Sequence, residues 1–519
     1  MSDGQDRGDD WDAPHEPDRR DDGEDVALTS LRSVSRGASM HLVGKFLFDV
    51  LDFILHVILT RALGSSAYGV FAYGHTFVQI AIVFTNLGTN NSLLKYIPEY
   101  ENNPRKQRLM VGLAYITSFT ASFVVAAAMF LLAPTINAYT LDEPLFTGVL
   151  QLFAIMLVFD TMLRVFNTTF RALERLEFQV LVQQIARPSV RIGAVLVALA
   201  LGLEFYGVMA SLVAASLLVL MLAFGIYVSR IDLRPTADPR KASRGEIVQY
   251  YNFSVPLMVK DAGAILRSRV DILMVGFFLS STAVGIYNVA LLISSMIGLA
   301  LSSFNQLFPP VASRLYSNGD IEELNDLFGI VTRWTVTIML FLGVAALVYR
   351  VELLLLFGEE FATDAAAMVV VLFVVGRLFS NGTGPSGYLL MISEHQYVLL
   401  ANQWFFGVLN VVANYYFIME YGLLGAALAT TIVNALNNIV KLLEIWYLEG
   451  LFPYSLSYLK PFGACGGAGL AMYLVGFYLS GLTLLVVGGL VGLVTYAALL
   501  VALGIEREDR EFFGSVLPF

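Results

Sequence analysis

Apolar stretches about as long as a membrane-spanning helix recur from residue 38 to residue 504, with short polar connections between them. About 17–25 apolar residues in helical form cross the hydrocarbon core of a bilayer. The pattern therefore predicts an all-α polytopic membrane protein with about 14 transmembrane helices. These predicted helices cover residues 38–62, 68–94, 109–134, 145–170, 178–202, 205–229, 250–279, 283–308, 328–351, 362–391, 397–419, 423–448, 459–480 and 482–504.

Two short segments indicate an internal repeat. SSTAVGIYNVA (Ser280–Ala290) resembles SSAYGVFAYGH (Ser65–His75), and superposing Gly69 on Gly285 brings the two into register. We therefore expect two pseudo-symmetric six-helix lobes. The last two predicted helices have no counterpart in the first half, and they are rich in glycine, which suits close helix packing in lipid.

Composition supports a membrane protein and narrows its chemistry. The chain is 57% hydrophobic and only 14% charged, whereas soluble domains carry about 25% charged residues. The single cysteine, Cys465, excludes an internal disulfide, and five scattered histidines show no metal-ligand spacing. We therefore expect no bound metal, no cofactor and no nucleic-acid partner.

Lysine and arginine gather in the loops on one side of the predicted bundle, the side that also holds both termini. This distribution predicts a multi-pass protein of the cell membrane with both termini in the cytoplasm. The predicted divisions are a disordered acidic cytoplasmic tail (1–36), an N-lobe with helices 1–6 (37–230), a cytoplasmic inter-lobe loop (231–248), a C-lobe with helices 7–12 (249–450), helices 13 and 14 (451–505) and a cytoplasmic C-terminus (506–519).

Ionisable residues inside predicted membrane helices are the candidate functional groups, because charge at that depth is costly. Spacings of four, three and four place four of them on one face of helix 1: Lys45, Asp49, Asp52 and His56. A shared face of helix 7 carries Lys260, Arg267 and Asp271, while Arg269 points elsewhere. Other helices add Asp160, Arg164, Arg187, Arg191 and Arg377.

Two interpretations of these charges stay open. In one, acids and bases pair to tie helices together, as Asp49–Arg267 or Asp160–Arg187 pairs would. In the other, they line a hydrated cavity that binds a charged cargo. Arginines outnumber acids at these positions, and guanidinium grips phosphate through two parallel hydrogen bonds. We therefore favour an anionic cargo held by Arg187, Arg191, Arg267, Arg269 and Arg377.

Several helix-breaking residues fall inside predicted spans. Pro188, Pro256 and the pair Pro309–Pro310 are expected to interrupt helices, and Gly382, Gly384, Pro385 and Gly387 are expected to break helix 10. Membrane helices tolerate such breaks when neighbours satisfy the freed backbone groups, so bends alone are weak support for transport.

Two stretches, Leu59–Tyr100 and Phe253–Ala290, resemble the polysaccharide flippases of the multidrug/oligosaccharidyl-lipid/polysaccharide exporter superfamily. The first carries the pattern as Arg61, Leu63, Gly64, Tyr68, Gly69, Phe71, Leu87, Gly88, Lys95 and Tyr96. The second carries it as Pro256, Asp271, Leu273, Met274, Val275, Gly276, Val284, Gly285, Ile286, Tyr287, Asn288 and Ala290.

The resemblance implies a function. Its members move oligosaccharides linked to polyprenyl or dolichyl phosphate from the inner to the outer leaflet, by alternating access to a cavity between two lobes. It implies that Lys45, Arg267 and Arg269 contact the phosphate and that helices 13 and 14 help to form a groove for the lipid tail. Membrane lipid and the lipid-linked glycan are the expected partners, and we expect the protein to act as a monomer.

Helix 1 departs from a purely anion-binding face because it carries two acids. Asp49, Asp52 and Asp271 are therefore candidates for coupling to H⁺ or Na⁺. The alternative function is a cation-coupled exporter of small molecules from the same superfamily. A membrane glycosyltransferase would need an aqueous domain or a long external loop with paired acids, which the sequence lacks, so we expect no enzyme. A non-transporting membrane scaffold is the remaining class.

Overall fold

The computed structural model describes residues 19–234, 243–504 and 506, and every regular element within them is helical. The elements of the first half are α1 (Arg19–Asn86), α2 (Thr89–Glu99), α3 (Pro104–Tyr139), α4 (Phe146–Ala172), α5 (Leu176–Gln179), η1 (Val180–Ala186), α6 (Arg187–Ala200) and α7 (Phe205–Arg230). Those that follow are α8 (Arg244–Phe278), α9 (Ser281–Ser295), η3 (Met296–Gly298), α10 (Leu299–Asn318), α11 (Ile321–Val348), α12 (Arg350–Phe357), η4 (Glu359–Phe361), α13 (Asp364–Asn381), α14 (Ser386–Ile392), α15 (Gln396–Glu449), η5 (Leu456–Tyr458), α16 (Leu459–Val475) and α17 (Gly481–Ala502).

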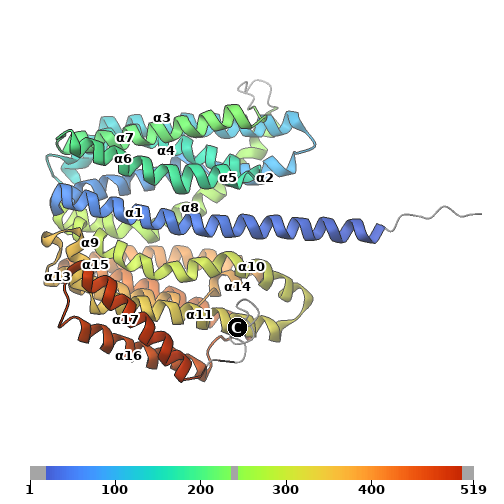
Figure 1. Ribbon diagram of the computed structural model, residues 1–519. Helices are drawn as coiled ribbons and strands as arrows, with labels where there is room; N and C mark the ends of the chain where they lie inside the picture. Colours follow the sequence, from blue (N-terminus) through green and yellow to red (C-terminus); the bar gives the residue numbers. More distant parts are fainter. Residues whose placement is uncertain (1–18, 235–242, 505, 507–519) are drawn as a thin grey trace, which may run out of the picture.

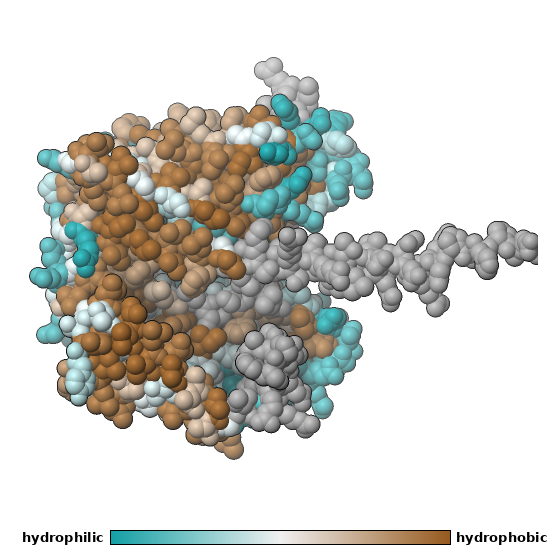
Figure 2. Space-filling view, viewed as in Figure 1, coloured by the Kyte–Doolittle hydropathy of each residue, from teal (hydrophilic) through white to brown (hydrophobic). Residues whose placement is uncertain are grey.

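A broad hydrophobic surface lies between two hydrophilic ends of the molecule (Figure 2). Nine stretches of helix in the described residues are long and apolar enough to cross a membrane. The prediction of an all-α polytopic membrane protein is thus confirmed. Among these nine stretches, α15 is counted once although it covers two predicted spans, and neither α1 nor α8 is among them. The total of 14 helices therefore stays a prediction.

Two long helices change direction at a glycine. Gly64 has φ 74° and ψ 176° inside α1, and Gly422 has φ 57° and ψ −131° inside α15. Positive φ costs an ordinary residue free energy that glycine avoids. Each helix therefore consists of two legs that meet at one end of the bundle. We call this end the distal end, and the opposite end, at which the N-terminal part of α1 enters, the proximal end.

The helices form two groups with α1 and α8 between them (Figure 1). On one side, α3, α4, α6 and α7 pack together; on the other lie α10, α11, α14, α16 and α17. The repeated glycines Gly69 and Gly285 face each other where α1 packs against α9. The division into two related lobes stays a prediction, but its two repeat segments do meet in space.

The predicted helix breaks have mixed outcomes. α13 ends at Asn381 and α14 begins at Ser386, so the break around Gly382, Gly384 and Pro385 is present. A new helix also begins beside Pro188. The predicted interruptions at Pro256 and at Pro309–Pro310 are wrong, because α8 and α10 run through them. A proline removes one backbone hydrogen bond and commonly bends a membrane helix without ending it.

The glycines of the last two helices allow close packing, as expected for helix contacts in lipid. A Cβ added at Gly467 would overlap the Leu499 side chain, and one at Gly492 would overlap Met472. Gly488 likewise lies against the Tyr349 hydroxyl. The pair α16 and α17 therefore packs onto itself and onto α11 and α12.

The polar ends of the chain differ from expectation in part. Of the predicted disordered tail, residues 1–18 lie outside the described residues, and residues 19–36 belong to α1. This stretch lacks proline, so its backbone can continue the helix that follows. Residues 235–242 of the inter-lobe loop and most of the C-terminus also lie outside the described part. Glu506 is described, and it pairs with Lys460 at 2.6 Å.

α8 begins within the predicted loop because Ser243 and Glu246 form a capping box. The Ser243 hydroxyl accepts from the Glu246 N–H (3.2 Å), and the Ser243 N–H donates to the Glu246 carboxylate (2.8 Å). The backbone hydrogen bond from Ser243 lowers the pKa of Glu246. This start point orients the helix that carries Arg267, Arg269 and Asp271.

Candidate functional site

A cavity of about 300 Å³ lies between α1 and the C-terminal group of helices. It brings together three predicted site residues of α1 with one of α13. Its lining is Lys45, Asp49, Val50, Asp52, Phe53, Leu292, Ser295, Met296, Gly298, Ser302 and Arg377. Cationic and anionic side chains thus share one space within the bundle, as the charged face of helix 1 indicates.

Lys45 donates to Asp49 at 2.8 Å, one helical turn away. The Asp49–Arg267 pair considered from the sequence is therefore absent from the structure, because the nearer Lys45 takes the carboxylate. The Lys45 and Asp49 side chains are 37% and 25% exposed. A pair so exposed contributes little to stability, and it can separate to meet a charged ligand.

Basic side chains of α8, α13 and α15 lie within electrostatic range of one another, and one of them, Arg377, lines the cavity. Arg267 donates to the Asn434 amide oxygen at 2.9 Å and lies within electrostatic range of Arg377 and Lys441. Arg269 interacts electrostatically with Asp271 and with Asp52. The expectation that Arg269 points away from the charged face of helix 7 stays a prediction.

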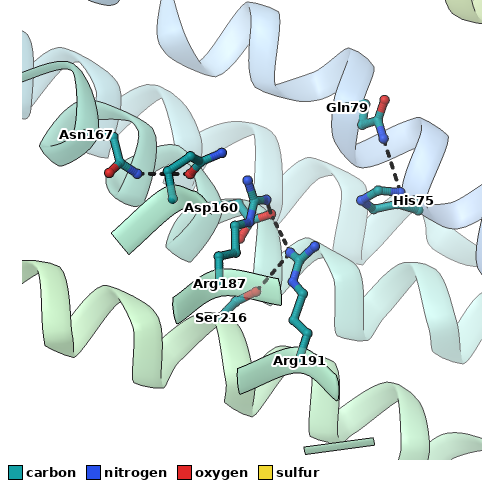
Figure 3. A network of polar contacts seen from close by, with 8 residues as sticks. His75, Gln79, Asp160, Asn167, Arg187, Arg191 and Ser216 are labelled. Atoms are coloured by element: carbon teal, nitrogen blue, oxygen red, sulfur yellow. Dashed lines mark hydrogen bonds and ion pairs between the residues drawn. The ribbon is translucent and has the colours of Figure 1, made fainter. Parts of the chain in front are cut away.

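A second basic cluster lies inside the N-terminal group of helices (Figure 3). Arg187 and Arg191 donate to the same oxygen of Asp160, at 2.7 and 3.1 Å, and Arg191 also reaches the Ser216 hydroxyl at 3.4 Å. Asp160 is buried, and Arg164 of the same helix lies within electrostatic range. The Asp160–Arg187 pair considered from the sequence is thus present, but the one carboxylate also binds Arg191 and has Arg164 within electrostatic range.

A π-helical turn positions this cluster. Pro188 has no N–H to donate to the carbonyl of Gln184, four residues earlier. The chain takes a wider turn over η1 just before Arg187. Wide turns of this kind are frequent at functional sites. Arg191 also lies within electrostatic range of Asp52, which lines the cavity.

Sequence reasoning missed a hydrogen-bonded chain that joins α1 to α9. Asn288 donates to the Tyr68 hydroxyl (2.7 Å), and that hydroxyl lies 2.8 Å from Nδ1 of the buried His56. Nε2 of His56 is 3.7 Å from Asp52. The helical spacing in the sequence identified His56 and Asp52 as candidate residues. Tyr68 and Asn288 were noted only as part of the family resemblance, which does not indicate a hydrogen bond between them.

Asp271 lies in a buried polar pocket of its own. Its carboxylate accepts from the Tyr287 hydroxyl (2.8 Å), the Ile272 N–H (2.9 Å) and the Thr430 hydroxyl (3.4 Å). Asn414 lies 3.4 Å from Thr430. Oxygen atoms of this kind can hold a small hard cation. No group of three or more His, Cys, Asp or Glu that could hold a metal occurs among the residues described.

The comparisons with known proteins place this arrangement in a family. The protein-family model described as "polysaccharide biosynthesis protein" matches residues 34–315, which is more than half of the chain. The probable flippase AglR of Haloferax volcanii is 24% identical over 429 residues, which cover 80% of this chain and 82% of AglR. The probable low-salt glycan biosynthesis flippase Agl15 of the same organism is 24% identical over 285 residues, covering 52% of this chain and 55% of Agl15.

A solved structure shares the fold. The lipid II flippase MurJ, in an inward closed conformation, superposes with a TM-score of 0.66 at 14% identity, covering 88% of this chain and 97% of that one. This likeness extends beyond the matched family region to the later helices. The chain belongs to the polysaccharide biosynthesis protein family.

Proposed function

We propose that this protein moves an oligosaccharide linked to a polyprenyl or dolichyl phosphate from the cytoplasmic to the outer leaflet. The observation that carries this proposal is the excess of buried guanidinium over carboxylate around Asp160. Arg187 and Arg191 both bind the carboxylate of Asp160, and Arg164 lies within electrostatic range of it. Because uncompensated charge is costly inside a membrane protein, an anionic ligand that neutralises it is favoured.

The cargo phosphate would be held from both sides of α1. Arg269 comes from α8, Arg377 from α13 and Lys45 from α1, and Arg267 lies within electrostatic range of Arg377. Arg187 and Arg191 would contribute their surplus charge from the other side. Guanidinium suits phosphate because it presents paired donors. The sugar head group would occupy the hydrated cavity while the lipid tail stays in the bilayer, along α16 and α17.

The proposed direction of transport places the proximal end in the cytoplasm, together with both termini. An anion that leaves an inside-negative cell gains about 2.3 kcal/mol per charge per 100 mV. Asp49, Asp52 and Asp271 remain candidates for H⁺ or Na⁺ coupling; the oxygen-rich surroundings of Asp271 favour it among the three. The exporter of small molecules is not favoured, since both relatives named above are described as flippases.

Cells that lack this protein are expected to accumulate lipid-linked glycans on the cytoplasmic leaflet, because synthesis continues while translocation stops. The measurement is leaflet assignment with a membrane-impermeant glycosidase or lectin, applied to sealed vesicles of known orientation. Cells with the restored gene serve as the control. An unchanged leaflet distribution in the deletion strain would remove the flippase proposal.

A further inference from the structure

Two carboxylates at the distal end each bind a serine of the opposite half of the chain. Glu360, just before α13, accepts from the Ser65 N–H (2.8 Å) and the Ser65 hydroxyl (2.7 Å). Glu143, just before α4, accepts from the Ser281 hydroxyl at 2.7 Å. The Ser281 hydroxyl also lies 3.0 Å from that of Ser66. The two halves are thus tied by a crossed pair of contacts.

The crossed contacts follow the internal repeat. The superposition of Gly69 on Gly285 places Ser65 on Ser281. Glu143 and Glu360 each lie in the short connection that leads into the fourth predicted helix of its half, α4 or α13. Each half therefore supplies one glutamate, and it also supplies, at the equivalent position, the serine that binds the glutamate of the other half. An accidental surface contact would have no reason to occur twice under this relation.

Each acid lies at the beginning of a helix of the other half. Ser65 follows the non-helical Gly64, and Ser281 is the first residue of α9. The first N–H groups of a helix lack intrahelical acceptors, and the helix dipole favours negative charge there. The hydrogen bonds from Ser65 lower the pKa of the Glu360 carboxyl. Each carboxylate therefore stabilises a helix start across the boundary between the halves.

Close backbone packing lies directly beneath these contacts and is also reciprocal. A Cβ added to Gly69 would overlap the Ser281 carbonyl oxygen, and one added to Gly285 would overlap that of Ser65. The serines that bind the acids are thus the same residues on which the opposite glycines pack. Any side chain at either glycine would force the halves apart at this end.

We propose that Glu143 and Glu360 are the gating residues of the distal side: their crossed bonds to Ser281 and Ser65, above the Gly69–Gly285 contact, hold the distal end closed and must break once in each transport cycle. The assignment to a transport cycle rests on the proposed function. The closing of the distal end rests on the contacts alone. Arg61 adds a third tie, donating to the carbonyls of Leu355 and Leu356 at 3.2 and 2.7 Å.

The test is a distance measurement between spin labels on the full-length protein in lipid nanodiscs. Labels at Glu204→Cys and Glu420→Cys report on the two halves, because both positions are exposed: Glu204 lies between α6 and α7, and Glu420 lies two residues before the bend of α15 at Gly422. The native Cys465 is replaced by alanine so that it takes no label. In this background, the Glu143→Ala, Glu360→Ala variant is expected to raise the ratio of long to short distances about tenfold, and each single variant about threefold.

Two further variants separate the effect of the crossed glutamate–serine contacts, here called the latch, from the effect of losing negative charge at the distal end. Asp142→Asn with Glu359→Ala removes two acids from the same turns, and it should leave the distances as in the parent. Gly69→Ala should lengthen the distances without any change of charge, by wedging the halves apart. If the double glutamate variant matches the parent, or if the Asp142, Glu359 control shifts as much, the latch is refuted. Because no cargo is present, a failure of the flippase proposal would leave this result unaffected.

Discussion

The Arg267→Ala, Arg269→Ala protein is expected to be correctly folded and almost inactive, with transport at least about 100-fold slower than that of the parent. Arg267 donates to the neutral Asn434, and Arg269 lies within electrostatic range of Asp52 and Asp271. Two charge-assisted hydrogen bonds to a phosphate amount to about 3–6 kcal/mol, which accounts for a loss of this size. Surface-glycan profiling together with initial transport rates provides the measurement.

Lys260→Ala is the matched control, because Lys260 is an exposed cation on the same helix. It should leave glycans and rates close to the parent values. The exporter alternative predicts the opposite pattern, in which Asp49→Asn loses transport and Arg267→Ala has no effect. Wild-type surface glycans in the double arginine variant would remove both residues from the site.

Asp160→Asn is expected to destabilise the protein by about 3–5 kcal/mol, the usual cost of leaving buried charges without their partner. The carboxylate is 1% exposed and accepts from Arg187 and Arg191, which are each 11% exposed. Its loss leaves three guanidinium groups in a poorly hydrated interior. Thermal unfolding of the detergent-solubilised protein, followed by loss of monodispersity, provides the measurement.

A second substitution shows whether charge causes the loss. Asp160→Asn combined with Arg187→Gln removes one of the stranded cations and should recover part of the stability. Asp142→Asn, at an exposed distal turn, should unfold like the parent. If Asp160→Asn melts at the parent temperature, the cluster is hydrated more than the structure indicates, and the surplus-charge argument for an anionic cargo weakens.

The sequence predicted the fold well because its dominant feature, apolar length, is local. The ends of α3, α4, α7 and α17 lie within a few residues of the predicted spans. The repeat at Gly69 and Gly285 also had a spatial meaning, since the two glycines are in contact. Proline was less informative: Pro256 lies within a continuous helix, while Pro188 lies at a helix start. Neighbouring helices, which the sequence does not specify, decide between these outcomes.

The site was predictable only to the level of residue type and helix face. Periodicity placed Lys45, Asp49 and Asp52 together, and all three line the cavity. It could not reveal that Arg267 donates to Asn434 instead of pairing with Asp49, because Asn434 lies 167 positions further along the chain. The Glu143–Ser281 contact joins residues 138 positions apart. The repeat relates Ser65 to Ser281, but it does not show that a glutamate of the opposite half binds each serine.

The most direct test of the central claim uses the purified protein in sealed liposomes with two matched fluorescent lipids. One carries a short saccharide on a polyprenyl phosphate, and the other carries the same saccharide on the uncharged polyprenol. A membrane-impermeant quencher reports the leaflet of each lipid over time. We predict rapid translocation of the phosphate-linked lipid and little movement of the neutral one. Equal rates for the two lipids, or no protein-dependent movement of either, would contradict an anion-binding flippase.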